Sequence, residues 1–94
     1  MPERPPPRRR ATALRYAPGD VAPRVVAQGR GLVAERIIEA AREAGVPVRS
    51  DPALAQALAA LELRDTVPEP LWRAVAEALA WAYRLDARAS AGRP

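Results

Sequence analysis

Prolines and glycines interrupt the sequence at short intervals, and this spacing constrains the fold more than any other feature. Of 94 residues, 11 are proline and 5 are glycine. Proline lacks a backbone N–H and glycine readily adopts φ > 0, so both residues concentrate at the ends of helices and strands. No interval holds about 20 consecutive apolar residues, so no membrane-spanning segment is expected. The sequence therefore predicts one small domain built from short elements.

Local patterns predict three short strands. Apolar and polar residues alternate over 12–17, which indicates a strand, and turn residues follow at 18–20. Two adjacent valines within 24–27 indicate a second strand. A third is expected at 46–49, where Pro47 favours an edge position because it cannot donate to a ladder.

Apolar residues at helical spacing predict three helices. One covers about 31–44 and ends at Gly45, which suits the left-handed position after a helix. A second begins at Pro52, with Asp51 as its N-cap. The last covers about 69–85. The order β-β-α-β-α-α indicates an α/β (α+β) fold in which a small mixed sheet of short strands is covered by three helices.

The two ends differ from the middle in composition and charge. We expect residues 1–10 to form a disordered arm rich in proline and arginine, residues 11–85 to fold, and residues 86–94 to form a flexible tail. The arm carries four arginines against one glutamate, a net charge of +3. The remaining residues carry eleven arginines against ten acids, a net of +1, so the basic charge of the chain belongs mainly to the arm.

The composition makes an enzyme unexpected. Cysteine, histidine, lysine and asparagine do not occur. This removes disulfides, thiolate chemistry, the commonest general base and metal ligand, and Schiff-base chemistry. The carboxylates of Glu35, Glu39 and Glu43 share one helical face, and a solvated surface explains them. We expect no catalytic residue, no cofactor and no metal, and the lack of cysteine favours a cytoplasmic setting.

Two tryptophans lie on opposite sides of the last predicted helix. Trp72 falls on the apolar stripe, and we expect it in the core. Trp81 follows nine residues later and points about 180° away. It is expected either to be exposed, as in contact patches rich in aromatic residues, or to be covered by a neighbouring element or a partner.

The arginine run at Arg8, Arg9 and Arg10 suggests weak contact with anionic surfaces. An anionic membrane or the phosphates of a nucleic acid would attract it, although a solvated tail is the simpler interpretation. A small nucleic-acid-binding protein that uses this arm is the alternative function. No specific nucleic acid is expected.

Five short motifs stand in an order typical of one known family. They are residues 13–16 (ALRY), 22–29 (APRVVAQG), 45–48 (GVPV), 52–58 (PALAQAL) and 67–81 (VPEPLWRAVAEALAW). In this order they resemble the cytoplasmic C-terminal domain of FlhB-type export switch proteins, the group that includes YscU, EscU and HrcU. The resemblance implies a small sheet surrounded by helices and a role in flagellar or type III protein export.

The sequence departs from this family at one motif. Members of this family carry an Asn-Pro-Thr-His loop just before the first strand and cleave themselves between Asn and Pro. Counting back from Tyr16, that loop falls on residues 6–9, of which only the proline matches. Without the asparagine side chain the cyclisation cannot proceed, so the resemblance is to a stand-alone, non-cleaving paralogue without the transmembrane part.

Binding is the family property that the sequence retains. The family is thought to receive export substrates in a small apolar patch, and Ala22, Pro23, Ala76 and Leu79 match its positions. Ala76 and Leu79 also lie on the predicted core stripe, so packing is the other interpretation for both. With Trp81 as a further contact, these residues form the expected binding site for export substrates or export-gate components. The expected location is the cytoplasm, or peripherally the export gate of the inner membrane.

Overall fold

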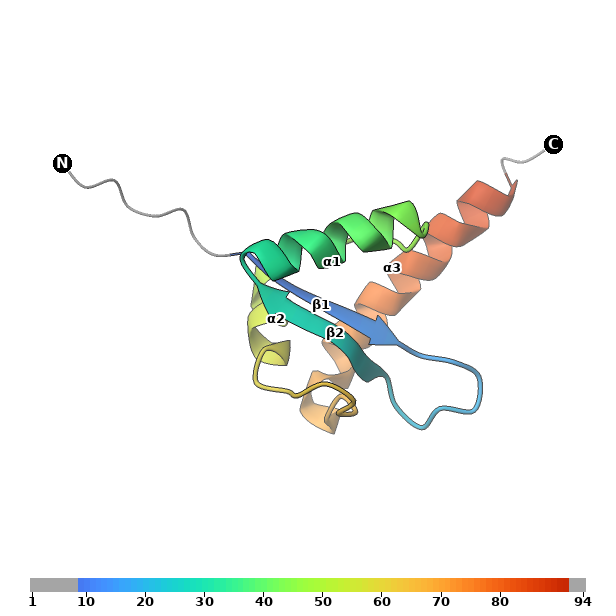
Figure 1. Cartoon of the computed structure of the whole chain (residues 1–94). Coiled ribbons are helices and arrows are strands. Elements are labelled where there is room, and N and C mark those ends of the chain that lie inside the picture. Colours follow the sequence, from blue (N-terminus) through green and yellow to red (C-terminus); the bar gives the residue numbers. More distant parts are fainter. Residues whose placement is uncertain (1–8, 92–94) are drawn as a thin grey trace.

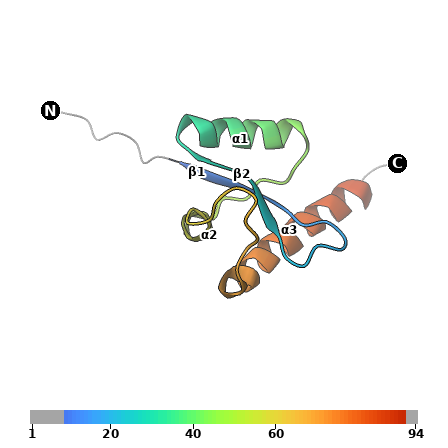
Figure 2. The same cartoon turned by 60° about the horizontal axis from the view of Figure 1, so that its bottom comes forward.

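The chain folds into a two-stranded hairpin with helices on both faces. The computed structural model describes residues 9–91. Its elements are β1 (Arg10–Arg15), β2 (Arg24–Arg30), α1 (Leu32–Glu43), α2 (Pro52–Leu58), the short 3₁₀ helix η1 (Glu69–Leu71) and α3 (Trp72–Ala91). Figures 1 and 2 show α1 against one face of the hairpin and α2 with α3 on the other. The predicted architecture of a small sheet covered by three helices is therefore confirmed.

The hairpin owes its register to a tight turn and a bulge. Asp20 donates its backbone N–H to the carbonyl of Ala17 at 3.0 Å, and its carboxylate accepts the N–H of Ala17 at 2.8 Å. Further along, Ala13 pairs with Ala27 but Leu14 pairs with Val25, so Val26 is the extra residue of a β-bulge. The bulge allows the two adjacent valines to differ in exposure. Val25 is fully buried, whereas Val26 is half exposed.

The α1 helix packs closely on the hairpin because β2 lacks a side chain at Gly29. A Cβ atom at this position would clash with the Val33 side chain. Ala34, one residue later, is completely buried. At its other end α1 closes with a Schellman motif, in which Val46 donates to the Ala41 carbonyl at 2.8 Å. Gly45 has φ +75° there, which confirms its predicted role.

The core lies on the other face, between the hairpin, α2 and α3. Leu54 and Leu58 of α2 meet Val67 and Val75, and the side chains packed around them are Leu14, Leu61, Leu71, Ala74, Ala78 and Leu79. The largest fully buried side chains are valines, so the core is small. The predicted N-cap of α2 is confirmed, since the Asp51 carboxylate accepts the N–H of Leu54 at 3.1 Å.

The third predicted strand, at 46–49, is wrong. In the described part of the chain the sheet has two antiparallel strands, so it is not mixed, and one isolated bridge joins Arg24 to Thr66. Pro47 lacks an N–H, and the N–H of Val46 already closes α1. The segment is an irregular connection from α1 to α2, and it has no backbone hydrogen bond to β1.

The last helix is longer than predicted and turned about its axis. It starts as η1 at Glu69, as expected, but α3 continues to Ala91, beyond the predicted start of the tail at residue 86. Its buried face is centred on Val75 and Ala78 and is rotated by about 60° from the predicted stripe. The prediction that Trp72 lies in the core is therefore wrong, since 43% of its surface is exposed.

The predicted boundaries of the arm, after residue 10, and of the tail, before residue 86, both fall inside elements of the structure, namely β1 and α3. Arg10 already belongs to β1, so the folded part begins one residue before its predicted start at residue 11, and the strand begins two residues before its predicted start at residue 12. Residues 1–8 and 92–94 lie outside the described residues. Within residues 9–91, no helix combines the length and the apolar composition that crossing a bilayer requires.

Candidate functional site

The loop before β2 is fixed to the segment before α3 by backbone hydrogen bonds. Val25 donates to the Asp65 carbonyl at 2.9 Å and accepts the N–H of Arg64 at 2.8 Å. Val67 donates to the Pro23 carbonyl at 2.8 Å. The Arg24 guanidinium adds a hydrogen bond to the Arg64 carbonyl. These contacts hold residues 22–25 and 64–67 side by side, although about 40 residues separate them in the sequence.

Trp72 completes this arrangement from the start of α3. Its indole N–H donates to the carbonyl of Val67 at 2.7 Å. The backbone of Val67 is therefore bonded on its N–H side to Pro23 and on its C=O side to Trp72. Because Val67 itself is buried in the core, both neighbours rest on a rigid base. The exposed part of the indole ring is thus held in one position.

The predicted binding residues on the loop and on α3 lie around this base. Ala22 is buried, Pro23 is half-buried and Ala76 is exposed. Leu79 is half-buried and packs against the core cluster that contains Val67. Core packing, the alternative interpretation, therefore applies to Leu79 but not to Ala76. We call these residues, together with Trp72, the Pro23–Trp72 surface.

Trp81, the remaining predicted site residue, belongs to another part of the molecule. It is half-buried, and the Arg49 guanidinium lies over its ring at 6.0 Å from the centroid. The same arginine approaches the carbonyl of Glu77 at 3.5 Å. Arg49, the last residue of the 46–49 connection, therefore lies over the Trp81 ring, which agrees with the interpretation that a neighbouring element covers it. The structure does not bring it to the Pro23–Trp72 surface.

Sequence reasoning missed Trp72 as a surface residue. The helical periodicity assigned it to the core because tryptophan is large and apolar. A better signal was available at Val67, because a residue before proline is disfavoured in the helical conformation, so Pro68 leaves the Val67 carbonyl outside the helix and free to accept the indole N–H. A tryptophan at such a helix start can stay at the surface and bond to the backbone.

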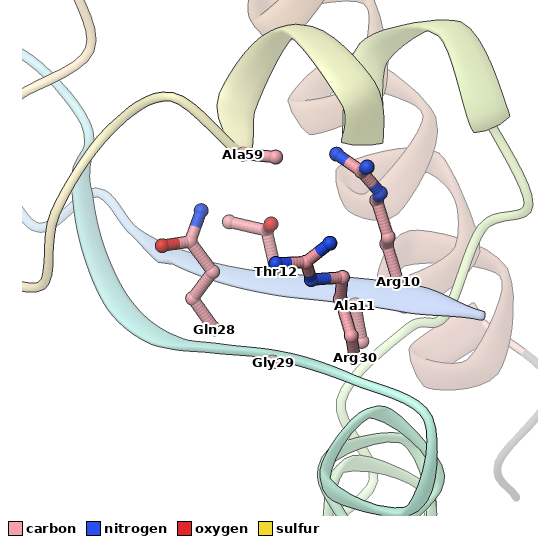
Figure 3. Close-up of a pocket in the computed structure, with 7 residues that line it drawn as sticks. All are labelled: Arg10, Ala11, Thr12, Gln28, Gly29, Arg30 and Ala59. Carbon is pink, nitrogen blue, oxygen red and sulfur yellow. The ribbon is translucent and has the colours of Figure 1, made fainter. Parts of the chain in front are cut away.

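A shallow hollow of about 210 Å³ lies at the open end of the hairpin (Figure 3). Arg10 and Arg30 are opposite each other in the β1–β2 register, and their side chains reach toward the α2 side. The Gln28 amide, at the other side of the hollow, donates to the Leu58 carbonyl at 2.8 Å. Arg9 and Arg10, which the sequence assigned to anionic contacts, are exposed here, whereas Arg8 lies outside the described residues.

The acidic side chains of the described residues do not gather into a metal site. No group of three or more carboxylate, imidazole or thiol side chains is placed to hold a metal ion within residues 9–91. Glu35, Glu39 and Glu43 are all exposed along α1. What the arrangement offers chemically is a fixed aromatic and apolar surface, which suits the binding of another protein.

Comparison with known proteins agrees with the resemblance seen in the motifs. The family model described as "FlhB HrpN YscU SpaS Family" matches residues 6–82. The chain is 44% identical over 81 residues to the Bacillus subtilis protein YlqH, an alignment that covers 85% of this chain and 87% of that protein. It is 46% identical over 77 residues to the Escherichia coli flagellar biosynthetic protein FlhB.

The two relatives differ in how much of them the chain spans. The alignment with FlhB covers 80% of this chain but only 20% of FlhB. Among solved structures, the cytoplasmic domain of FlhB from Shewanella putrefaciens matches with a TM-score of 0.82 and 36% identity, covering 89% of this chain and 71% of that chain. Sequence and fold agree, and the chain belongs to the family of FlhB, HrpN, YscU and SpaS.

Proposed function

We propose that this protein is a non-catalytic binding module of flagellar or related type III protein export. It binds export substrates or components of the export gate through the Pro23–Trp72 surface. Family membership supports the export role, since the relatives include proteins named for flagellar biosynthesis. The observation that carries the binding role is the exposed Trp72, whose indole is fixed on the backbone of buried Val67 beside Pro23.

The chemistry of this surface favours an apolar side chain as the ligand. Pro23 and Ala76 reach the surface and carry short side chains, so they leave room for a side chain to lie against the tryptophan ring. Trp72 presents a large contact area that loses little conformational entropy on binding, because its N–H already has a partner. An extended or helical segment with one protruding apolar residue fits this description.

The protein does not cleave itself in this proposal. The residues that precede β1 contain proline but no asparagine, and asparagine is absent from the whole sequence. Self-cleavage would need an asparagine side-chain amide to attack its own backbone carbonyl, and this chain has no asparagine. We also place the protein in the cytoplasm, as in the cytoplasmic domain of the FlhB structure that it resembles.

A pull-down with the full chain, combined with mass spectrometry, tests the binding role. We expect it to recover export-gate proteins or flagellar export substrates. Ala76→Glu should reduce recovery at least about tenfold by placing a charge on the apolar surface. Ala40→Glu is the matched control. Ala40 is exposed, as Ala76 is, but it lies on α1, on the other face of the sheet.

Two results would contradict the proposal. Recovery of ribosomal proteins or RNA alone would favour the nucleic-acid alternative, and deletion of residues 1–10 would then abolish the binding. An equal loss of partner recovery for Ala76→Glu and Ala40→Glu would show that the Pro23–Trp72 surface is not the binding site. The absence of self-cleavage is checked by the intact mass after prolonged incubation at neutral pH, where a fragment broken near residues 6–7 would refute it.

A further inference from the structure

Two arginines face each other across the open end of the hairpin. Arg10 and Arg30 are direct partners in the β1–β2 register, and Thr12 is the partner of Gln28. Because side chains alternate between the two faces of a sheet, both pairs project to the same face. The Gln28 amide donates to the Leu58 carbonyl at 2.8 Å, so this is the face that α2 covers. Figure 3 shows both guanidiniums on this face, at the hollow of about 210 Å³.

The pair of Arg10 and Arg30 is electrostatically unfavourable by itself. Residues directly opposite each other in an antiparallel pair have Cβ atoms about 4.5–5.5 Å apart, and like charges at such positions destabilise a sheet. No acidic side chain is among the described residues that line the hollow. An anion bound between the two guanidiniums would replace this repulsion by two attractive contacts.

Other arginines next to the sheet have partners within the chain. Arg24, at the start of β2, faces Arg15 in the register, but its guanidinium donates to a backbone carbonyl in the segment before α3. Arg9, the residue before β1, lines a second hollow together with Glu35 and Glu39 of α1. Within residues 9–91, the arginine pair at the α2 side has neither kind of partner.

We propose that the hollow at the open end of the hairpin binds a phosphate group through Arg10 and Arg30. Each guanidinium presents a planar fork of N–H donors that fits two oxygens of a phosphate or a carboxylate. One carboxylate has a single charge and two oxygens, which one fork occupies. A phosphate monoester has nearly two charges and three free oxygens, so it can bond to both forks. The Thr12 hydroxyl, which also lines the hollow, is a further donor.

The size of the hollow limits how much of the ligand it holds. Pockets for small organic molecules usually measure about 300–1,000 Å³, so this hollow takes the phosphate group and leaves the rest of the ligand outside. The phosphate is therefore either part of a soluble molecule or the headgroup of a lipid. The site lies at the other end of β2 from Pro23 and does not depend on the function proposed for the Pro23–Trp72 surface.

An NMR titration of the full chain with inorganic phosphate tests the site. At about pH 8 the phosphate is mainly dianionic. We expect saturable shifts of the guanidinium carbon signals of Arg10 and Arg30 and of the Thr12 amide, with a Kd of about 1 mM for two charge-assisted contacts. Sodium chloride at the same ionic strength should not produce these shifts, because chloride cannot bond to both forks in this way.

Substitutions of single arginines separate a built site from a general effect of charge. Arg10→Gln and Arg30→Gln should each weaken phosphate binding at least about tenfold, because each removes one fork. Arg15→Gln is the matched control, since Arg15 is exposed and lies at the other end of β1, and it should change the Kd less than about twofold.

Arg30→Lys keeps the charge but loses the fork. It should weaken phosphate binding at least about threefold, a difference that charge alone would not produce. Arg30 is exposed, so this conservative variant should fold, and it remains informative if a neutral variant does not.

Cosedimentation with lipid vesicles distinguishes the two sources of the phosphate. Phosphatidylcholine vesicles that contain phosphatidic acid present phosphate monoesters, whereas phosphatidylglycerol in the same fraction presents phosphodiesters. Capture by phosphatidic acid alone, lost in Arg30→Gln and reversed by inorganic phosphate, would identify a lipid headgroup. Saturable binding of inorganic phosphate without capture by vesicles would identify a soluble ligand.

Several outcomes would overturn the proposal. One is the lack of a saturable shift at about twenty times the expected Kd. Others are equal weakening by Arg15→Gln and Arg30→Gln, or an unchanged Kd in Arg30→Lys. Tighter binding of a peptide with two adjacent glutamates would make an acidic protein segment the ligand instead. Tighter binding of an oligonucleotide without terminal phosphates would favour a nucleic acid.

Discussion

The hydrogen bond from Trp72 to Val67 fixes the Pro23–Trp72 surface, and its removal has a measurable effect on stability. Trp72→Phe keeps an aromatic ring at the start of α3 but deletes the N–H that donates to the Val67 carbonyl at 2.7 Å. A neutral hydrogen bond contributes about 0.5–1.5 kcal/mol to stability, and a buried carbonyl left without a partner costs about 1–3 kcal/mol. Because 43% of Trp72 is exposed, water can reach part of the site.

Because water can partly replace the lost hydrogen bond, we expect the loss of stability to lie near the lower end of the range of about 1–3 kcal/mol. We predict that Trp72→Phe lowers the free energy of unfolding by about 1 kcal/mol. In a domain of this size that corresponds to a fall in Tm of about 4–8 °C. Urea denaturation followed by far-UV circular dichroism measures the first quantity, and a thermal melt measures the second. Partner recovery should fall as well, because the ring is no longer held in one orientation.

Trp81→Phe is the matched control. Among the contacts in the described residues, the indole N–H of Trp81 donates no hydrogen bond, and the Arg49 guanidinium lies 6.0 Å from the ring centroid. A cation–π contact at that distance is weak, so the control should change stability by no more than about 0.5 kcal/mol. Equal losses for the two variants, or an unchanged stability for Trp72→Phe, would refute the argument that Trp72 is fixed by its hydrogen bond.

Two further substitutions test the packing of the helices. Gly29→Ala should destabilise the protein by about 1–3 kcal/mol because the new Cβ clashes with Val33, and the additional change Val33→Ala should restore most of the loss. A denaturation cycle with both single variants measures the coupling, and additive effects would show that α1 does not rest on Gly29. Asp51→Ala should cost about 1 kcal/mol by removing the N-cap of α2. Asp51→Asn keeps an accepting oxygen and should lose much less.

The elements of the fold could be predicted because local chemistry specifies them. Asp51 and Pro52 determine the start of α2, and Gly45 determines the end of α1, whatever packs around them. The strand at 46–49 could not be decided in this way. A strand requires a partner for its backbone groups, and the apolar residues of the segment do not reveal whether such a partner exists.

The orientation of α3 shows a second limit of the sequence. Large apolar residues suggested a stripe that included Trp72 and Ala76, but the buried face contains Ala74 and Ala78 instead. Alanine fits both a core and a surface, so periodicity alone cannot choose between faces that differ by about 60°. The matches at Ala22, Pro23, Ala76 and Leu79 came from the resemblance to the family, whereas Trp72 required the hydrogen bond that the structure shows.

Exposure of apolar side chains does not by itself mark a binding site in a domain with so small a core. Val21, Leu32 and Tyr83 are all well exposed here, as scattered apolar residues are on most proteins. The Pro23–Trp72 surface differs because a polar contact holds its aromatic ring on a buried base, so binding does not have to order it. This surface therefore combines an exposed aromatic ring with a rigid support.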